Sequence, residues 1–121
     1  MAMPMLPLEL SFAGNSTVSA HGLLDSGSAV NVLPHLLGLH LGAEWEKHSA
    51  RVTLSGNLGA HDARALVLEA RIADFPPVKL VFAWTQAPDV PLLLGQVNFF
   101  QEFDVCIHGS RRQFEVQPHQ Q

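Results

Sequence analysis

The sequence predicts an all-β domain, and two observations carry this prediction. Apolar and polar residues alternate in several short stretches, which is typical of strands that bury one face. Glycine, proline, asparagine and aspartate interrupt the chain often, which favours turns over long helices. The chain has 121 residues, which suits a single domain over 1–121 with residues 118–121 as a frayed tail.

Six longer strands are expected, each with apolar residues at alternate positions or as a short β-branched run. These strands are 6–12, 17–24, 29–33, 49–55, 63–73 and 78–84. Turn-forming residues at 13–16 predict a hairpin between the first two strands. Two glycines and an asparagine in 56–59 predict a second hairpin, between 49–55 and 63–73.

One or two short helices are expected among these strands. Pro34 favours the first turn of a helix, and Gly42 ends the pattern that follows it. The segment 96–103 is long enough for two helical turns. The segments 103–108 and 112–117 flank a short turn and predict a final hairpin.

Two apolar runs that end in glycine resemble one another, "LLDSG" (23–27) and "LLLG" (92–95). Each is expected to form a short buried strand that stops where the backbone turns sharply. We expect these two strands to lie side by side at the centre of a barrel.

Composition excludes several classes of function. The net charge is −4 and the only adjacent basic pair is Arg111-Arg112, so binding of nucleic acid or of an anionic membrane is not expected. The N-terminus lacks the basic start of a signal peptide, and no apolar run is long enough to span a bilayer, which predicts a cytoplasmic protein. Cys106 is the single cysteine, so no intrachain disulfide forms. The seven histidines lack the spacing of a zinc site, and neither a metal nor a cofactor is expected.

Asp25 is the residue whose position packing explains least. It follows the apolar run 22–24 and precedes Ser26, Gly27 and a β-branched run. A buried carboxylate is costly unless it is hydrogen-bonded or protonated. One interpretation is a turn in which the Asp25 side chain accepts hydrogen bonds from the amides of Gly27 or Ser28. The other is that Asp25 is a catalytic group.

Three segments in this order resemble the retropepsin-like aspartic proteases, the single-domain relatives of the retroviral protease. "LLDSGSAVNVLP" (23–34) is similar to the active-site segment of that family. "VTLSGNLGAHDA" (52–63) has the position and the glycine content of the family's flap hairpin. "VPLLLGQVNFF" (90–100) is similar to its second signature, an apolar pair followed by glycine. The resemblance covers nearly the whole chain and implies a closed acid-protease barrel with a flap, active as a homodimer.

The resemblance also implies a role for each site residue. Asp25 is the catalytic residue, and its partner is Asp25 of a second chain, because only one Asp-Ser-Gly occurs. Ser26 braces the active-site loop across the dimer axis, and Gly27 leaves room for the substrate backbone. Ser28 and Ala29 line the cleft. The flap residues that close over an extended peptide are Ser55, Gly56, Asn57, Leu58 and Gly59. The segments 6–12 and 112–117 are candidates for a sheet between the subunits.

The sequence departs from many retroviral members at two positions. Ala29 and Gln96 stand where those members carry an acidic residue and an arginine, so both partners of that ion pair are missing together. The function expected is that of an aspartic endopeptidase, which hydrolyses peptide bonds flanked by apolar residues. An alternative is a retropepsin-like module for dimerisation or peptide binding with little or no proteolytic activity. An unrelated β-barrel binding protein would require all three segments to be coincidental.

Overall fold

The structure, a computed structural model, describes residues 4–25, 27–48, 52, 54, 61–95, 103–108 and 113–118. The strands are β1 (Met5–Ser11), β2 (Val18–Leu24), β3 (Asn31–Pro34), β4 (Ala63–Arg71), β5 (Val78–Thr85), β6 (Leu93–Leu94), β7 (Phe103–His108) and β8 (Gln113–Pro118). In the described residues one α-helix, α1 (His35–His40), and one short 3-10 helix, η1 (Trp45–Lys47), follow β3. In the described part of the chain no helix is long and apolar enough to cross a membrane.

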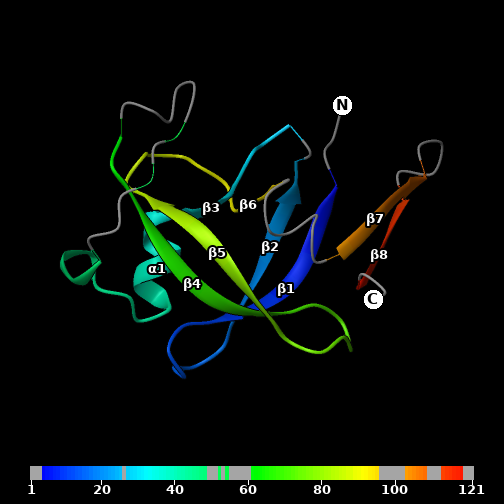
Figure 1. Cartoon of the computed structure of the whole chain (residues 1–121), viewed down its shortest axis with the longest axis horizontal. Helices are drawn as coiled ribbons and strands as arrows, with labels where there is room; N and C mark the ends of the chain where they lie inside the picture. The colour runs from blue at the N-terminus through cyan, green and yellow to red at the C-terminus, as the bar shows by residue number, and fades with distance from the viewer. Residues whose placement is uncertain are drawn as a thin grey trace.

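Six strands close into a barrel in the order β1-β2-β6-β3-β5-β4, as Figure 1 shows. The predicted all-β class and the predicted closed barrel are confirmed. β1 and β2 form the expected antiparallel hairpin. β4 pairs with β5 from Ala63 opposite Thr85 to Ala70 opposite Val78. The barrel closes where β1 pairs with β4 at Glu9–Ser11.

The two apolar runs that end in glycine lie side by side, as predicted. β2 and β6 are parallel, with Leu23 opposite Leu93 and Leu24 opposite Leu94. On its other edge β6 pairs with β3 through Leu93 and Val32. The short strand β6 therefore joins the strand that precedes Asp25 to the strand that follows it.

The core fills the barrel with side chains at alternate strand positions. It includes Leu6, Leu8 and Leu10 of β1, together with buried residues of β2, β4, β5 and β6. Trp84 is fully buried between the barrel and α1, where its Nε1–H donates to the carbonyl oxygen of His35 at 3.0 Å. A Cβ at Gly38 of α1 would lie 2.2 Å from Nε1 of Trp84, so this position of the helix requires glycine.

The predicted helix start at Pro34 is wrong, because α1 begins at His35. It is the last residue of β3, where it lies opposite Thr85, and it is the extended residue before α1 with a ψ of 147°. Its missing N–H costs nothing at the end of a strand or at the start of a helix. The expected strand 29–33 likewise begins two residues later, at Asn31, because residues 27–30 belong to a turn and bends. The helix ends before Gly42, whose φ is +92°.

The proposed intersubunit role of segment 6–12 is wrong for Glu9 and Leu10. There β1 has β2 on one edge and β4 on the other, so no backbone edge remains for a second chain. Of the hairpin predicted between 49–55 and 63–73, the described residues show one hydrogen bond, from Val52 N–H to the carbonyl oxygen of Ala63. The rest of that hairpin lies outside the described residues.

The C-terminal hairpin is confirmed as a two-stranded sheet of β7 and β8. Figure 1 shows this hairpin beside the barrel, on the side of β1 and away from α1. Pro118 is the last residue of β8 and lies opposite Phe103, so it is no part of a frayed tail. Phe103 begins β7, and the remainder of the helix expected at 96–103 lies outside the described residues.

Candidate active site

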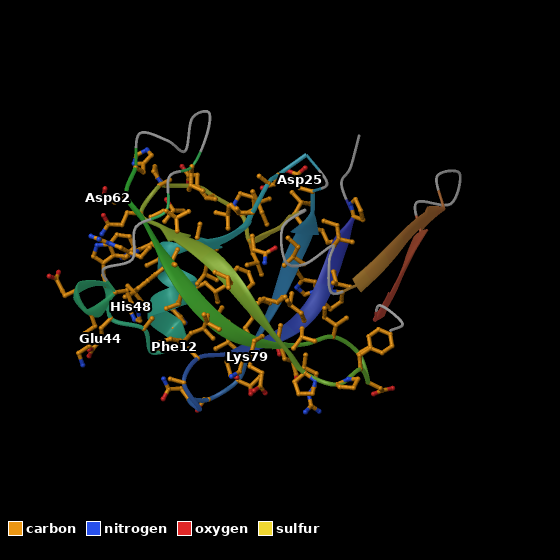
Figure 2. All side chains as sticks on the ribbon, in the orientation of Figure 1. Phe12, Asp25, Glu44, His48, Asp62 and Lys79 are labelled. Carbon is orange, nitrogen blue, oxygen red and sulfur yellow. The ribbon has the colours of Figure 1, made fainter. Side chains whose placement is uncertain are left out.

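Asp25 lies directly beyond the end of β2, at the rim of the barrel, as Figure 2 shows. Its backbone N–H donates to the carbonyl oxygen of Leu94 at 3.0 Å. Two residues earlier, Leu23 N–H donates to the carbonyl oxygen of Leu92 at 2.8 Å. The parallel ladder between β2 and β6 therefore continues as far as Asp25 and fixes where its backbone leaves the barrel.

The side chain of Asp25 closes a tight turn. Its Oδ1 accepts a hydrogen bond from Gly27 N–H at 3.0 Å, and its carbonyl oxygen accepts one from Ser28 N–H at 3.1 Å. The turn interpretation of the sequence is thus correct. The Asp25 residue is only half-buried, so a carboxylate held by the turn remains open to chemistry at the rim.

Gly27 leaves space beside the carboxylate of Asp25. It is exposed, and among the described residues a Cβ built there would meet only Oδ1 of Asp25, at 3.3 Å. Ser28 turns its hydroxyl inward, where Oγ donates to the carbonyl oxygen of Val30 at 2.8 Å, and Ala29 is exposed. The structure thus gathers four of the predicted site residues, Asp25, Gly27, Ser28 and Ala29, in one turn. Their roles toward a substrate stay predictions.

The other predicted site residues lie outside the described part of the chain. They are Ser26 and the flap residues Ser55, Gly56, Asn57, Leu58 and Gly59. Among the described residues, no group of three or more His, Cys, Asp or Glu side chains could hold a metal ion.

An aliphatic cluster adjoins the segment 25–30, which we call the Asp25 turn. Val32, Leu54, Ala63 and Ala83 are buried in it, and half-buried valine and leucine side chains pack against them. These half-buried residues are Val30, Val52, Val90 and Leu93. Val30 belongs to the turn itself, and Leu93 lies one residue before the Leu94 carbonyl that binds Asp25. The cluster places half-buried apolar side chains next to the backbone that holds Asp25.

Asn31 is a site residue that the sequence analysis missed. Its side chain is fully buried at the start of β3 and bonds to two other segments of the barrel. Oδ1 accepts from Gly95 N–H at 2.9 Å, and Nδ2 donates to the carbonyl oxygen of Val81 at 3.0 Å. The available signal was an amide side chain inside the β-branched run "AVNVL", where an unpaired polar group is costly.

A surface hollow of about 410 Å³ lies elsewhere, on the outer side of β1 and β4. Its lining includes Phe12, Val67 and the oppositely charged pair Glu69 and Lys79. Figure 2 shows Lys79 at the opposite end of the barrel from Asp25. This hollow is therefore not part of the candidate site around Asp25.

Comparison with solved structures relates this geometry to a known fold. The chain is similar to the EIAV protease complexed with the inhibitor HBY-793, with a TM-score of 0.57 and 14% sequence identity. The match covers 78% of this chain and 82% of that chain. No protein-family model matches the sequence, and no curated protein matches it. The closed six-stranded barrel and this likeness show that the chain has a retropepsin-like fold.

Proposed function

We propose that the protein is an aspartic endopeptidase in which Asp25 carries the chemistry. The observation that carries the proposal is the attachment of the Asp25 turn to the end of β6, in a barrel with a retropepsin-like fold. The attachment holds a half-buried carboxylate at the rim of the barrel, next to an exposed glycine and a partly open aliphatic cluster. A peptide substrate needs these three features: a reactive group, backbone clearance and apolar contact.

The proposal requires two chains, because one chain supplies one Asp-Ser-Gly carboxylate. A two-fold axis beside the turn brings two copies of Asp25 together. Two carboxyl groups that lie this close cannot both ionise, so the pair shares one proton and titrates as a unit. The ionised carboxylate takes a proton from a water molecule, and the protonated one polarises the scissile carbonyl group. The water oxygen bonds to the carbonyl carbon, the tetrahedral diol collapses, and the leaving amine receives a proton from the pair.

The C-terminal hairpin supports association of two chains. Its register sets Phe103, Val105 and Ile107 opposite Pro118, Val116 and Phe114 respectively. Residues directly opposite in an antiparallel pair share a face, so the register assigns these six apolar residue types to positions of one face. The other face carries Asp104, Cys106 and His108 opposite Gln117, Glu115 and Gln113. A two-stranded sheet is marginally stable in isolation, and an apolar face gives it a surface to bury against a second copy.

The aliphatic cluster suggests which peptides are cleaved. Val30, Val90 and Leu93 are half-buried at the edge of the cluster, beside the turn that holds Asp25. An extended peptide with leucine, valine or similar side chains next to the scissile bond would bury apolar area there. The resemblance implies that a flap at 55–59 closes over such a peptide.

The test compares two asparagine substitutions. Asp25→Asn keeps an oxygen that can accept the Gly27 N–H bond but removes the ionisable carboxyl group. Asp74→Asn makes the same chemical change in the exposed turn between β4 and β5. We expect Asp25→Asn to abolish cleavage of an aliphatic peptide library, and Asp74→Asn to cleave as the parent does. Parental cleavage by Asp25→Asn contradicts the proposed function.

A retropepsin-like binding module is the competing function, since the fold alone does not require turnover. It predicts that the parent binds extended aliphatic peptides without hydrolysing them. Peptide binding by the parent, measured by isothermal titration calorimetry and followed by mass spectrometry of the recovered peptide, separates the two functions. Intact peptide after prolonged incubation favours the binding module.

A further inference from the structure

Asn31 has a position that packing alone does not explain. It is one of two fully buried polar side chains in the described part of the chain, the other being Thr85. Its carboxamide lies between β5 and the residue after β6, and it bonds both by one donor and one acceptor. A neutral group with an acceptor and a donor on the same carbon meets both demands, and among short side chains asparagine provides it independently of pH.

Gly95, whose N–H donates to Asn31, lies against the Asp25 turn. A Cβ at Gly95 would lie 2.5 Å from the carbonyl oxygen of Val30 and 2.8 Å from that of Ser28. Gly95 therefore lies in direct contact with the backbone of the turn. The neighbouring residue, Leu94, accepts the hydrogen bond from Asp25 N–H. A shift of Gly95 would displace the backbone of residues 28–30. It would also displace the neighbouring Leu94 carbonyl oxygen, to which Asp25 N–H is bonded.

We propose that Asn31 is a positioning residue, which sets the place of the Asp25 carboxyl group by holding Gly95 against the 28–30 backbone. This inference rests on the proposed function of Asp25. In this role Asn31 contacts none of the reacting atoms. The carboxamide fixes the end of β6, the end of β6 fixes the turn, and the turn fixes how closely two Asp25 carboxyl groups approach. Because proton sharing depends on that approach, a small displacement is expected to cost much of the catalytic rate.

Asn31→Asp gives a test in which pH controls the defect. The introduced carboxyl group is nearly the same shape as the amide. When neutral, it can accept from Gly95 N–H and donate its own O–H to the Val81 carbonyl oxygen. When ionised, it can no longer donate and faces that carbonyl with a negative charge. We expect the kcat of the variant to be near the parental value at acidic pH and to fall below it by about tenfold or more toward neutral pH, with little change in KM.

Two further variants separate positioning from stability. Gly95→Ala inserts a Cβ against the 28–30 backbone and should lower kcat at every pH, because it introduces no titrating group. Thr85→Val is the matched control, since Thr85 is as buried as Asn31 and loses two hydrogen bonds, to the carbonyl oxygen of Asp62 and from Ala87 N–H. It should lower the melting temperature and leave kcat within about twofold of the parent, because the two hydrogen bonds that it removes join Thr85 to Asp62 and Ala87 and not to the Asp25 turn.

NMR titration of the Asp25 carboxyl carbon provides a measurement that needs no turnover. We expect Asn31→Asp, above the pH at which its new carboxyl ionises, and Gly95→Ala to change the Asp25 titration curve, and Thr85→Val to leave it unchanged. An Asp25 curve that stays parental in both site variants, with the variants folded, overturns the positioning role. If Asn31→Asp does not fold, Gly95→Ala decides the matter. The Asp25→Asn comparison decides the proteolytic function, so the two proposals can fail separately.

Discussion

The backbone N–H of Asp25 and the carbonyl oxygen of Leu94 are joined by a 3.0 Å hydrogen bond, although 69 positions separate the two residues in the sequence (94 minus 25). This bond continues the parallel pairing of β2 with β6. It connects the two apolar runs that end in glycine at the point where the carboxylate leaves the barrel. The geometry of the candidate site is therefore a property of the barrel and does not depend on a loop alone.

The aliphatic cluster gives a prediction about substrate choice. Val30→Asp places a charge at the edge of that cluster and should raise KM for peptides with leucine or valine at the scissile bond by about tenfold, a loss of ~1–3 kcal/mol of apolar contact. Val67→Asp is the control, because Val67 is 51% exposed on the outer side of β4. Steady-state kinetics on one aliphatic peptide measure both variants. An unchanged KM in Val30→Asp removes the cluster from the substrate site.

The register of the C-terminal hairpin gives a prediction about association. The register places Val116 opposite Val105, at a position of the face proposed to join two chains, and places the neighbouring Gln117 opposite Asp104, at a position of the other face. Val116→Asp should weaken self-association by about tenfold or more, whereas Gln117→Asp should have little effect, because a charge buried in an interface is far more costly than one in water. Sedimentation velocity over a range of concentrations measures this difference. Equal association constants for the two variants would show that this face does not join the chains.

The contact between Gly38 and Trp84 gives a prediction about stability. Alanine is the better helix former by about 1 kcal/mol, but its Cβ would overlap the Trp84 ring, which is fully buried and tied to His35. The overlap should dominate, so Gly38→Ala should lower the free energy of unfolding by about 2 kcal/mol. Leu36→Ala, at a position that is 69% exposed on the same helix, is the control. Urea denaturation would contradict this account if Gly38→Ala proved more stable than the parent.

The proton sharing proposed for two Asp25 carboxyl groups gives a prediction about pH. Under this proposal the pair is active only while it holds one proton, so loss of rate is expected both when the second proton binds and when the last one leaves. The pH profile of kcat/KM on an unchanged peptide should therefore be bell-shaped with an acidic limb. A profile that is flat from mildly acidic to neutral pH is incompatible with a pair that shares one proton.

Alternation of apolar residues predicted much of the barrel, because strands that bury one face must alternate. Leu6, Leu8 and Leu10 of β1 and Leu66, Leu68 and Ala70 of β4 follow directly from it, whereas residues 82–85 at the end of β5 are all buried. The pairing of β2 with β6 was predictable for a different reason, namely that both runs are apolar, short and end in glycine. Pairings that depend on the closure of the barrel were not predictable. The pairing of β1 with β4 is one such case. It occupies an edge of the segment 6–12, which the sequence analysis had proposed for a sheet between subunits.

The candidate site was predicted in part. Asp25 and Gly27 were recognisable because a carboxylate and a glycine after an apolar strand have few packing explanations. Asn31 was not, because its role depends on Gly95 and Val81, which are distant in sequence and meet it only in the closed barrel. The boundary at Pro34 was misplaced because proline suits both the end of a strand and the start of a helix.

Mixing the parent with Asp25→Asn tests most directly the central claim, that one site is built from two Asp25 carboxyl groups. Chains are mixed in equal amounts at a fixed total concentration that keeps them dimeric, and cleavage is measured after subunits have exchanged. Random pairing makes about one quarter of the dimers fully parental, so a shared site predicts about one quarter of the parental activity. An activity of about one half, in proportion to the parental chains, would show that each chain acts alone and would contradict the account.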